Sequence, residues 1–387
     1  MSGTAVALRL TCPTCGTDSR ETLLELDDVP VFCNVLLETR AAAELAPRAD
    51  LRLVFCERCA TIWNAAFDPS VVGYAIGYEN SLHFSPTFQR YAESLAERLI
   101  ARYRIRGKAV IDVGAGTGEF LDVLAGLGGS RGIGFDPSHP DDERAAGSGS
   151  VRLVQDFYGE RHADLPADLV CCRHVLEHVP EPLAFLAELR RTLGNRPETV
   201  LYVEVPAAEY VLGEVAVYDL IYEHFSVFSE PALRNILGRA GFRVLDAGLS
   251  FGGQYLWAEA VPGQDRPSPP DVRGLRELAR AFEPAARERI ERGGSAIRPG
   301  GSTVVWGAGS KGVTFLNLVP GAAGVELAVD VSPRKWGRYV PGTAQRVVPP
   351  GELPSSVDTV VVMNRLYEDE VRQDVRAYCS RAEVVVA

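Results

Sequence analysis

The sequence predicts an α/β chain in which a small four-cysteine unit precedes two Rossmann-like units, each built on a parallel sheet. Two CxxC pairs stand near the N-terminus, strand-like apolar runs alternate with helical patterns in the central part, and a second pattern of strand, glycine turn and helix begins near residue 303. The expected boundaries are 1–75 for the cysteine unit, 76–262 for the larger Rossmann-like unit, 263–298 for a linker helix and 299–387 for the smaller unit.

Composition limits what the chain can do. With 387 residues, 46% of them hydrophobic, it can bury two or three cores. The net charge of −11 opposes binding to nucleic acid and to anionic membranes, so we expect a small-molecule substrate and neither of those partners. No apolar run has the length of a signal peptide or of a membrane span, which predicts a cytoplasmic protein. We also expect the protein to be monomeric or weakly homo-oligomeric.

The four cysteines of the first unit predict a metal site. Cys12 and Cys15 form one CxxC pair, and Cys56 and Cys59 form the other. Each pair can direct two thiolates at one tetrahedral ion, and four thiolates leave no open position. We therefore expect a structural Zn²⁺ that stabilises a unit too small for its own core. Four unrelated buried cysteines, or a nucleic-acid-binding ribbon, are the alternatives, and the ribbon lacks the basic and aromatic residues it would need.

A glycine-rich turn follows the first predicted strand of the central unit, with Gly114, Gly116 and Gly118 in the string VIDVGAGTG. Such a turn lets the backbone approach a ligand closely. Asp112 before the glycines suits a cationic ammonium group and would repel a pyrophosphate. Asp136 follows the next strand about twenty residues on, where a carboxylate suits ribose hydroxyls. A turn needed only for packing is the alternative.

A third acidic residue, Asp156, follows the next strand, and with Phe157 it could clamp an adenine by its amino group and its face. This order of motifs resembles the class I S-adenosylmethionine-dependent methyltransferases over roughly residues 80–260. The resemblance implies S-adenosylmethionine as the cofactor. The residues then expected to bind it are Phe84, Ser85, Phe88, Asp112, Gly114, Gly116, Gly118, Asp136, Pro137, Asp156, Phe157, Arg173 and His174.

The string from His174 to His178 has two interpretations. It resembles the methyltransferase segment after the fourth strand, but His-Val-Leu-Glu-His also spells the HxxEH pattern of inverted zinc proteases. That pattern should begin inside a helix, whereas His174 directly follows an apolar strand. We therefore expect contacts with the methionine end of the cofactor, or helix capping, in preference to a catalytic metal.

Three further strings resemble one family along nearly the whole chain. They are YENSLHFSPTFQ from Tyr78, YEHFS from Tyr222, and WGAGSKG from Trp306. Together with the four cysteines they resemble the zinc-binding sugar C-methyltransferases of deoxysugar and natural-product biosynthesis, which are 3-C-methyltransferase-like. The resemblance implies C-methylation of a nucleotide-linked keto-deoxysugar, with His224 as the catalytic base.

Methylation of a carbon beside a ketone explains this residue set. An α-proton must leave so that the enolate can attack the methyl group of the sulfonium. His224 has an intrinsic pKa near the working pH, and Glu223 could orient it or stabilise its charge. Tyr222 or Tyr78 could donate to the enolate oxygen. A core histidine satisfied by its neighbours is the alternative for His224. The residues expected to bind the acceptor are His83, Lys311 and Lys335.

Two departures keep other functions open. The segment Ser250–Trp257 reads SFGGQYLW where sugar-nucleotide members usually show His-Gly-Gly-Ser-Leu-Arg, so a non-sugar, N or O acceptor is an alternative. The turn Gly307–Gly312 with Asp330 satisfies the dinucleotide fingerprint, so an NAD-dependent oxidoreductase is a rival. Lys311 inside that turn favours instead a degenerate unit that holds the acceptor's nucleotide or closes the cleft. An inactive zinc-ribbon interaction protein would not need the three acidic residues.

Overall fold

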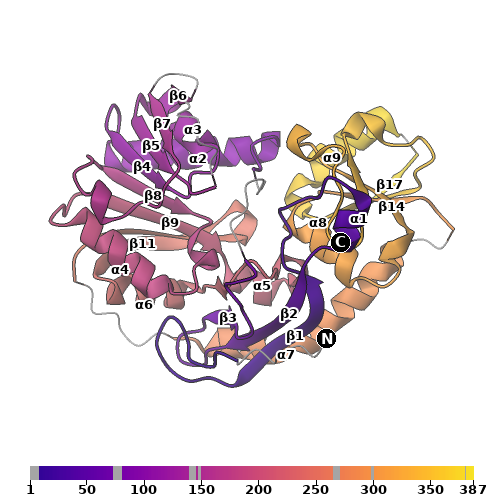
Figure 1. Ribbon diagram of the computed structural model, residues 1–387, viewed down its shortest axis with the longest axis horizontal. Helices are drawn as coiled ribbons and strands as arrows, with labels where there is room; N and C mark the ends of the chain where they lie inside the picture. Colours follow the sequence, from indigo (N-terminus) through magenta and orange to yellow (C-terminus); the bar gives the residue numbers. More distant parts are fainter. Residues whose placement is uncertain are drawn as a thin grey trace.

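Three sheets organise the residues that the computed structural model describes, which are 8–72, 81–138, 145–146, 150–264, 271–297, 300–379 and 381–387. In Figure 1 the eight-stranded sheet stands on the left and the five-stranded sheet on the right. The two long strands β1 (Glu21–Pro30) and β2 (Arg48–Phe55) of the four-stranded sheet run beneath both.

The eight-stranded sheet has the order β11-β12-β9-β8-β4-β5-β7-β6. Its strands are β4 (Ala109–Val113), β5 (Arg131–Phe135), β6 (Ala145–Ala146), β7 (Val151–Val154), β8 (Leu169–Arg173), β9 (Val200–Pro206), β11 (Phe242–Ser250) and β12 (Tyr255–Pro262). The five strands from β9 to β7 are parallel, while β12 lies antiparallel between β9 and β11. The predicted parallel α/β sheet is confirmed, with an antiparallel edge that the sequence pattern did not indicate.

Helices cover both faces of this sheet because its strands are apolar on both sides. They are α2 (Pro86–Tyr103), α3 (Glu119–Gly128), α4 (Pro182–Leu193) and α6 (Glu230–Arg239). Strand β8 shows the division: Leu169 and Cys171 join the core of α2 and α3, and Val170 and Cys172 join that of α4 and α6. The parallel strands of this sheet have their carboxyl ends at the same edge, and the glycine turn after β4 lies at that edge.

The N-terminal sheet is completed by the central part of the chain. Its order is β1-β2-β3-β10, with β3 at Ile62–Asn64 and β10 at Ser226–Val227. The short helix α1 (Arg40–Glu44) lies between strands β1 and β2 in the chain. Leu24 and Leu53 pack in one cluster with Phe282 and Phe315 from later helices, so this unit shares a core with its neighbours.

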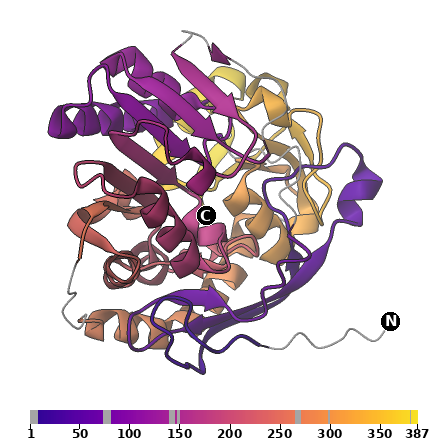
Figure 2. The ribbon, with the colours of Figure 1, turned by 60° about the vertical axis from the view of Figure 1, so that its left-hand side comes forward.

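The expected linker helix is part of the packed structure. Helix α7 (Arg273–Gly293) buries Ala279, Phe282 and Ala286 against β1 and the helix α5 (Ala208–Gly213). Figure 2 shows α7 along the lower edge of the molecule, beside the N-terminal sheet. Its three buried residues recur at helical spacing, so one face of the expected linker helix packs against its neighbours.

The C-terminal sheet is wholly parallel, in the order β15-β14-β13-β16-β17. Its elements are β13 (Thr303–Trp306), α8 (Ser310–Leu318), β14 (Val325–Val329), β15 (Arg346–Val348), β16 (Thr359–Val362), α9 (Glu368–Tyr378) and β17 (Glu383–Val386). A Cβ on Gly312 would lie 1.8 Å from the carbonyl oxygen of Gly307, so the turn into α8 requires glycine there. Within the described residues, no helix combines the length and the apolar character that a membrane span needs.

Candidate active site

The glycine turn after β4 and the acidic residue after β5 form one structural unit. Gly114, Gly116 and Gly118 all have positive φ, at 72°, 55° and 84°. A Cβ on Gly114 would lie 2.2 Å from a methyl group of Val175, so only glycine fits. The amide of Gly116 donates to the carboxylate of Asp136 at 2.9 Å. The turn thus presents its backbone beside a carboxylate, an arrangement that is typical of a cofactor site.

Asp112 is the buried acid of this site. Its side chain lies at the end of β4 and the residue is only 5% exposed. Burial raises the pKa of Asp112 to about 7, which the charge on Arg173 lowers and the charge on Asp136 raises. Among the described residues, none forms a hydrogen bond to its carboxylate. Asp112 therefore has unused acceptor capacity beside the turn, which fits a cationic ligand group.

The residues that are predicted to contact ribose and adenine differ in whether their side chains already bind other parts of the chain. Asp136, next to Pro137, accepts from the backbone and hydroxyl of Ser138 with its second oxygen. The ring of Phe157 is 65% exposed, unusual for a large apolar side chain, and is open to a stacking partner. The carboxylate of Asp156 already pairs with Arg161. An adenine amino group would have to share that carboxylate.

Residues before and within α2 connect the cofactor unit to the C-terminal unit. Ser85 caps α2 by accepting from the amide of Phe88, and its hydroxyl donates to Glu370 of α9 at 2.8 Å. The ring of Phe84 lies 5.3 Å beneath the guanidinium of Arg334, and the buried Phe88 contacts His83 edge to face. These positions hold the two units together beside the turn. Tyr78 lies outside the described residues.

Arg173 and His174 are tied to a buried glutamate of β9. Arg173 donates twice to Glu204, at 3.0 and 2.9 Å, and stacks on Phe120. His174 has a positive φ of 55°, and its Nε2 lies 3.3 Å from Glu204. Burial alone would lower the pKa of His174, but Glu177 and Glu204 raise it to about 9. The charges of both residues are therefore compensated by buried carboxylates.

His224 meets two residues of the HxxEH string. Glu177 and His178 lie on a short 3₁₀ turn (Leu176–His178), and His224 lies just before β10. The imidazole rings of His178 and His224 are 4.8 Å apart between centroids. Burial lowers the pKa of His224 to about 3, as does the charge on His178, while Glu177 raises it. His224 is therefore neutral, and its Nδ1 is buried without a hydrogen-bond partner.

Tyr222 and Glu223 precede His224 in the chain, but their polar groups bind backbone groups of the N-terminal unit. Glu223 points its carboxylate at the backbone amide of Cys33, at 2.7 Å, and burial raises its pKa to about 8. The hydroxyl of Tyr222 accepts from the amide of Asp68 and donates to the carbonyl of Ala66. In their place, Glu177 and His178 lie beside His224. Sequence reasoning missed these two, although the HxxEH string contained the signal.

Both lysines expected to bind the acceptor are engaged in ion pairs. The ammonium group of Lys311 lies 2.6 Å from Asp219, and that of Lys335 lies 3.1 Å from Asp330. Asp330 also accepts from the amide of Ala308 in the second glycine turn. The ion pair of Asp330 with Lys335, which has no counterpart at Asp136 among the described residues, makes this second turn less suited to NAD.

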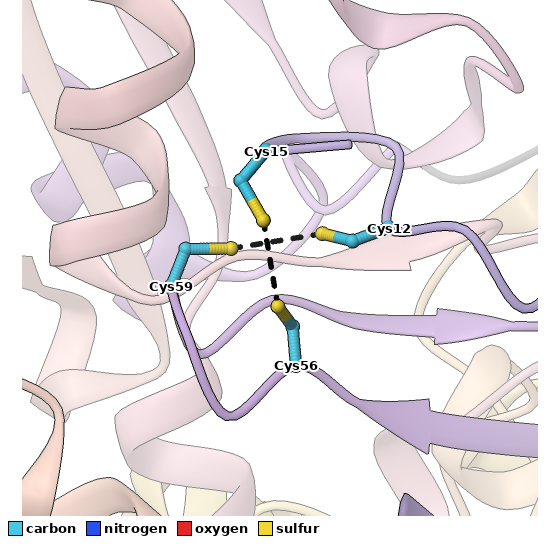
Figure 3. Close-up of side chains that lie close together, drawn as sticks. All are labelled: Cys12, Cys15, Cys56 and Cys59. Atoms are coloured by element: carbon cyan, nitrogen blue, oxygen red, sulfur yellow. Dashed lines mark hydrogen bonds between the residues drawn. The ribbon is translucent and has the colours of Figure 1, made fainter. Parts of the chain in front are cut away.

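The four cysteines come together as predicted. Their sulfur atoms point toward a common centre between the two CxxC turns (Figure 3). The Sγ atoms of Cys12 and Cys59 are 3.6 Å apart, and those of Cys15 and Cys56 are 3.5 Å apart. Four Zn–S bonds of about 2.3 Å around a tetrahedral ion would set the sulfurs about 3.8 Å apart. The cluster needs only a small expansion to hold Zn²⁺.

Comparison with known proteins identifies the central and C-terminal parts. Residues 88–247 match a family described as a methyltransferase domain, and residues 274–387 match one described as a C-methyltransferase C-terminal domain. The ubiquinone biosynthesis O-methyltransferase of Neisseria meningitidis serogroup C is 32% identical over 167 residues, which are 38% of this chain and 69% of that protein. The tRNA U34 carboxymethyltransferase of Marinobacter nauticus is 32% identical over 149 residues, 36% of this chain and 45% of that protein.

One solved structure is similar to less than half of this chain. The 1,6-didemethyltoxoflavin-N1-methyltransferase of Burkholderia thailandensis, with bound S-adenosylhomocysteine, is 19% identical with a TM-score of 0.35, covering 46% of this chain and 82% of that one. The sequence relatives, together with the glycine turn and its acidic partners, decide the assignment. The chain belongs to the S-adenosylmethionine-dependent methyltransferases.

Proposed function

We propose that the protein is a C-methyltransferase that acts on a nucleotide-linked keto-deoxysugar. The match of residues 274–387 to a C-methyltransferase C-terminal domain carries this proposal. That unit lies against the cofactor turn, because Arg334 reaches Thr117 at 3.3 Å and Glu370 accepts from Ser85. A unit so placed can hold the nucleotide of the acceptor while its sugar meets the methyl group. A diphosphate there would compete with Asp219 for Lys311.

The proposed chemistry assigns each group a simple task. The cofactor, when bound, supplies an electrophilic methyl group. Asp112 holds its ammonium group, Asp136 its ribose, and the exposed ring of Phe157 its adenine. His224 takes the α-proton of the acceptor at its unpartnered Nδ1. Tyr222, whose hydroxyl is bound to backbone, positions the segment that carries His224.

A hydroxyl acceptor is the second candidate. The curated relatives that match the central part include O-methyltransferases by name. The chain also lacks the histidine and arginine that sugar-nucleotide members usually carry around Gly252 and Gly253. With a hydroxyl acceptor, the proton that His224 removes would come from oxygen instead of carbon.

Asp136→Ala should weaken binding of S-adenosylmethionine by about 1 to 3 kcal/mol, because charged hydrogen bonds to the ribose are lost. Calorimetric titration of wild-type and variant protein measures this, and NAD is titrated in parallel. Asp136→Asn removes the charge but keeps an oxygen that can accept from the amide of Gly116, so it separates these two contributions. Equal cofactor affinity in the Ala variant, or tighter binding of NAD than of S-adenosylmethionine, contradicts the proposed site.

Cofactor affinity should fall as the pH drops below about 7. Burial raises the pKa of Asp112 to about 7, with Arg173 and Asp136 as the charges that face it. Below that pH the carboxyl must lose its proton before it can hold an ammonium group, which costs up to tenfold in affinity per pH unit. Titrations between pH 5.5 and 7.5 test this, since the ammonium of the cofactor stays largely protonated there. Asp112→Asn should flatten the profile; a wild-type profile that is already flat excludes Asp112 as the partner.

We also propose that the four cysteines hold one structural Zn²⁺. The nearly tetrahedral spacing of the sulfur atoms supports this. The cluster of Cys12, Cys56 and Cys59 is buried together with Trp63 and Phe225. Because Phe225 directly follows His224, the metal would stabilise the segment on which the proposed base is carried.

A further inference from the structure

A second group of metal-binding side chains lies beside the proposed methyl-transfer site. Glu177, His178 and His224 each offer one ligand atom, and these three atoms lie within 4.8 Å of one another. A tetrahedral ion with bonds of about 2.1 Å separates its ligands by about 3.4 Å, so small side-chain rotations would close the set. The three residues come from two segments, the 3₁₀ turn after β8 and the loop before β10.

Unsatisfied atoms in the cluster point to a missing ligand. The Oε2 of Glu177 and the Nδ1 of His224 are both buried without a hydrogen-bond partner. A buried polar atom left in this way costs about 1 to 3 kcal/mol, and an ion bound between the two would recover that free energy. His174 lies 3.6 Å from the other oxygen, Oε1 of Glu177, and therefore does not satisfy Oε2.

The orientation of His178 also fits a ligand. Its Nδ1 lies 2.9 Å from the backbone carbonyl oxygen of Glu223. A bond from one imidazole nitrogen to a backbone carbonyl fixes the orientation of the ring, as is usual for metal-binding histidines. Glu223, whose side chain turns toward Cys33, contributes to the site through its backbone.

We propose that Glu177, His178 and His224 bind a divalent transition-metal ion. Two imidazoles and one carboxylate suit Zn²⁺, Mn²⁺, Fe²⁺ or Co²⁺. Three protein ligands leave positions open, in contrast to the four-cysteine cluster, so the ion can polarise an oxygen atom of the acceptor. The proposed site differs from the HxxEH pattern of inverted zinc proteases: its third residue is His224, from a distant segment, whereas the first histidine of the string pairs with Glu204.

The catalytic consequence rests on the proposed function. When the metal is bound, the ligand nitrogen of His224 is committed to the ion. A bound ion would acidify the acceptor by drawing electron density from its keto or hydroxyl oxygen, and a water on the ion, once deprotonated, would supply the base. His224 is thus a base in the metal-free protein and a ligand in the loaded one.

Mn²⁺ is the probe that tests the site, because it prefers nitrogen and oxygen ligands and competes poorly for the thiolates of the cysteine cluster. Electron paramagnetic resonance of free Mn²⁺ measures how much the full-length protein binds. We expect one Mn²⁺ per chain in the wild type. Glu177→Gln and His224→Ala should each weaken binding at least about tenfold, the size of effect seen even for residues behind a metal's ligands.

Glu209→Gln is the matched control. Glu209 is a partly buried glutamate on α5 that also has one oxygen without a partner, but it lies outside the cluster. The Glu209→Gln variant should bind Mn²⁺ as tightly as the wild type does. Circular dichroism should show that all variants are folded. The proposal is overturned if the wild type binds no Mn²⁺, or if Glu177→Gln and His224→Ala bind it as tightly as the control.

Separate measurements keep this proposal apart from the proposed function. If the protein binds Mn²⁺ at this site but has no affinity for S-adenosylmethionine, the methyltransferase chemistry is rejected and the metal site is retained. Turnover that proceeds in a protein shown to bind no Mn²⁺ would reject the metal site and keep the methyltransferase chemistry.

Discussion

His224→Ala should lower turnover by about a hundredfold to ten-thousandfold while affinity for S-adenosylmethionine stays nearly unchanged. The variant removes the group that accepts or helps to displace the acceptor's proton, but it leaves the glycine turn and Asp136 intact. The measurement is kcat with a keto-deoxysugar nucleotide, together with loss of the α-proton to heavy water. Exchange should disappear with turnover, because both need the same deprotonation.

Glu177→Gln distinguishes the two roles of His224. If His224 acts only as a base, Glu177→Gln should keep most of the α-proton exchange. If both residues hold a metal, the two variants should lose exchange and Mn²⁺ binding together. Wild-type turnover in His224→Ala would place the base elsewhere, and an acceptor that proves to be an alcohol would reject the enolate route while leaving methyl transfer intact.

The central sheet could be predicted because its local signals agree with one another. Strand β4 is buried at all five positions, and each of them except Asp112 carries an apolar side chain. The fourth strand of the N-terminal sheet could not be predicted in this way. Strand β10 has two residues, and its pairing of Ser226 with Trp63 joins distant parts of the chain. Such a contact depends on tertiary packing and leaves no periodic pattern in either segment.

The site was predictable to the extent that residue spacing determines it. The glycine turn and Asp136 meet because a parallel strand pair places both at one edge of the sheet. The direction of a side chain is not encoded by spacing. Glu223 stands next to His224 in the chain, yet its carboxylate turns to Cys33, and Glu177 takes the place beside His224. Adjacent side chains in a loop point in different directions, so sequence proximity does not indicate which carboxylate lies beside His224.

Cys56→Ser should remove the bound Zn²⁺ and lower the free energy of unfolding by more than about 4 kcal/mol, the range reached when a metal site is lost. A domain is stable by only about 5 to 15 kcal/mol, so the variant would be close to unfolding at ordinary temperature. Metal analysis of protein purified without chelator gives the zinc content, and chemical denaturation gives the stability. We expect one Zn²⁺ per chain in the wild type that is absent in the variant.

Cys379→Ser is the matched control, because Cys379 is as buried as the cluster cysteines but lies at the end of α9. It should keep its zinc and most of its stability. The Cys56 variant should also lose turnover, since Trp63 and Phe225 pack with the cysteines and Phe225 is the neighbour of His224. Cofactor binding should persist in any folded fraction, because the glycine turn belongs to the central sheet. If the variant folds and turns over like the control, the cysteine cluster supports neither the N-terminal sheet nor the placement of His224.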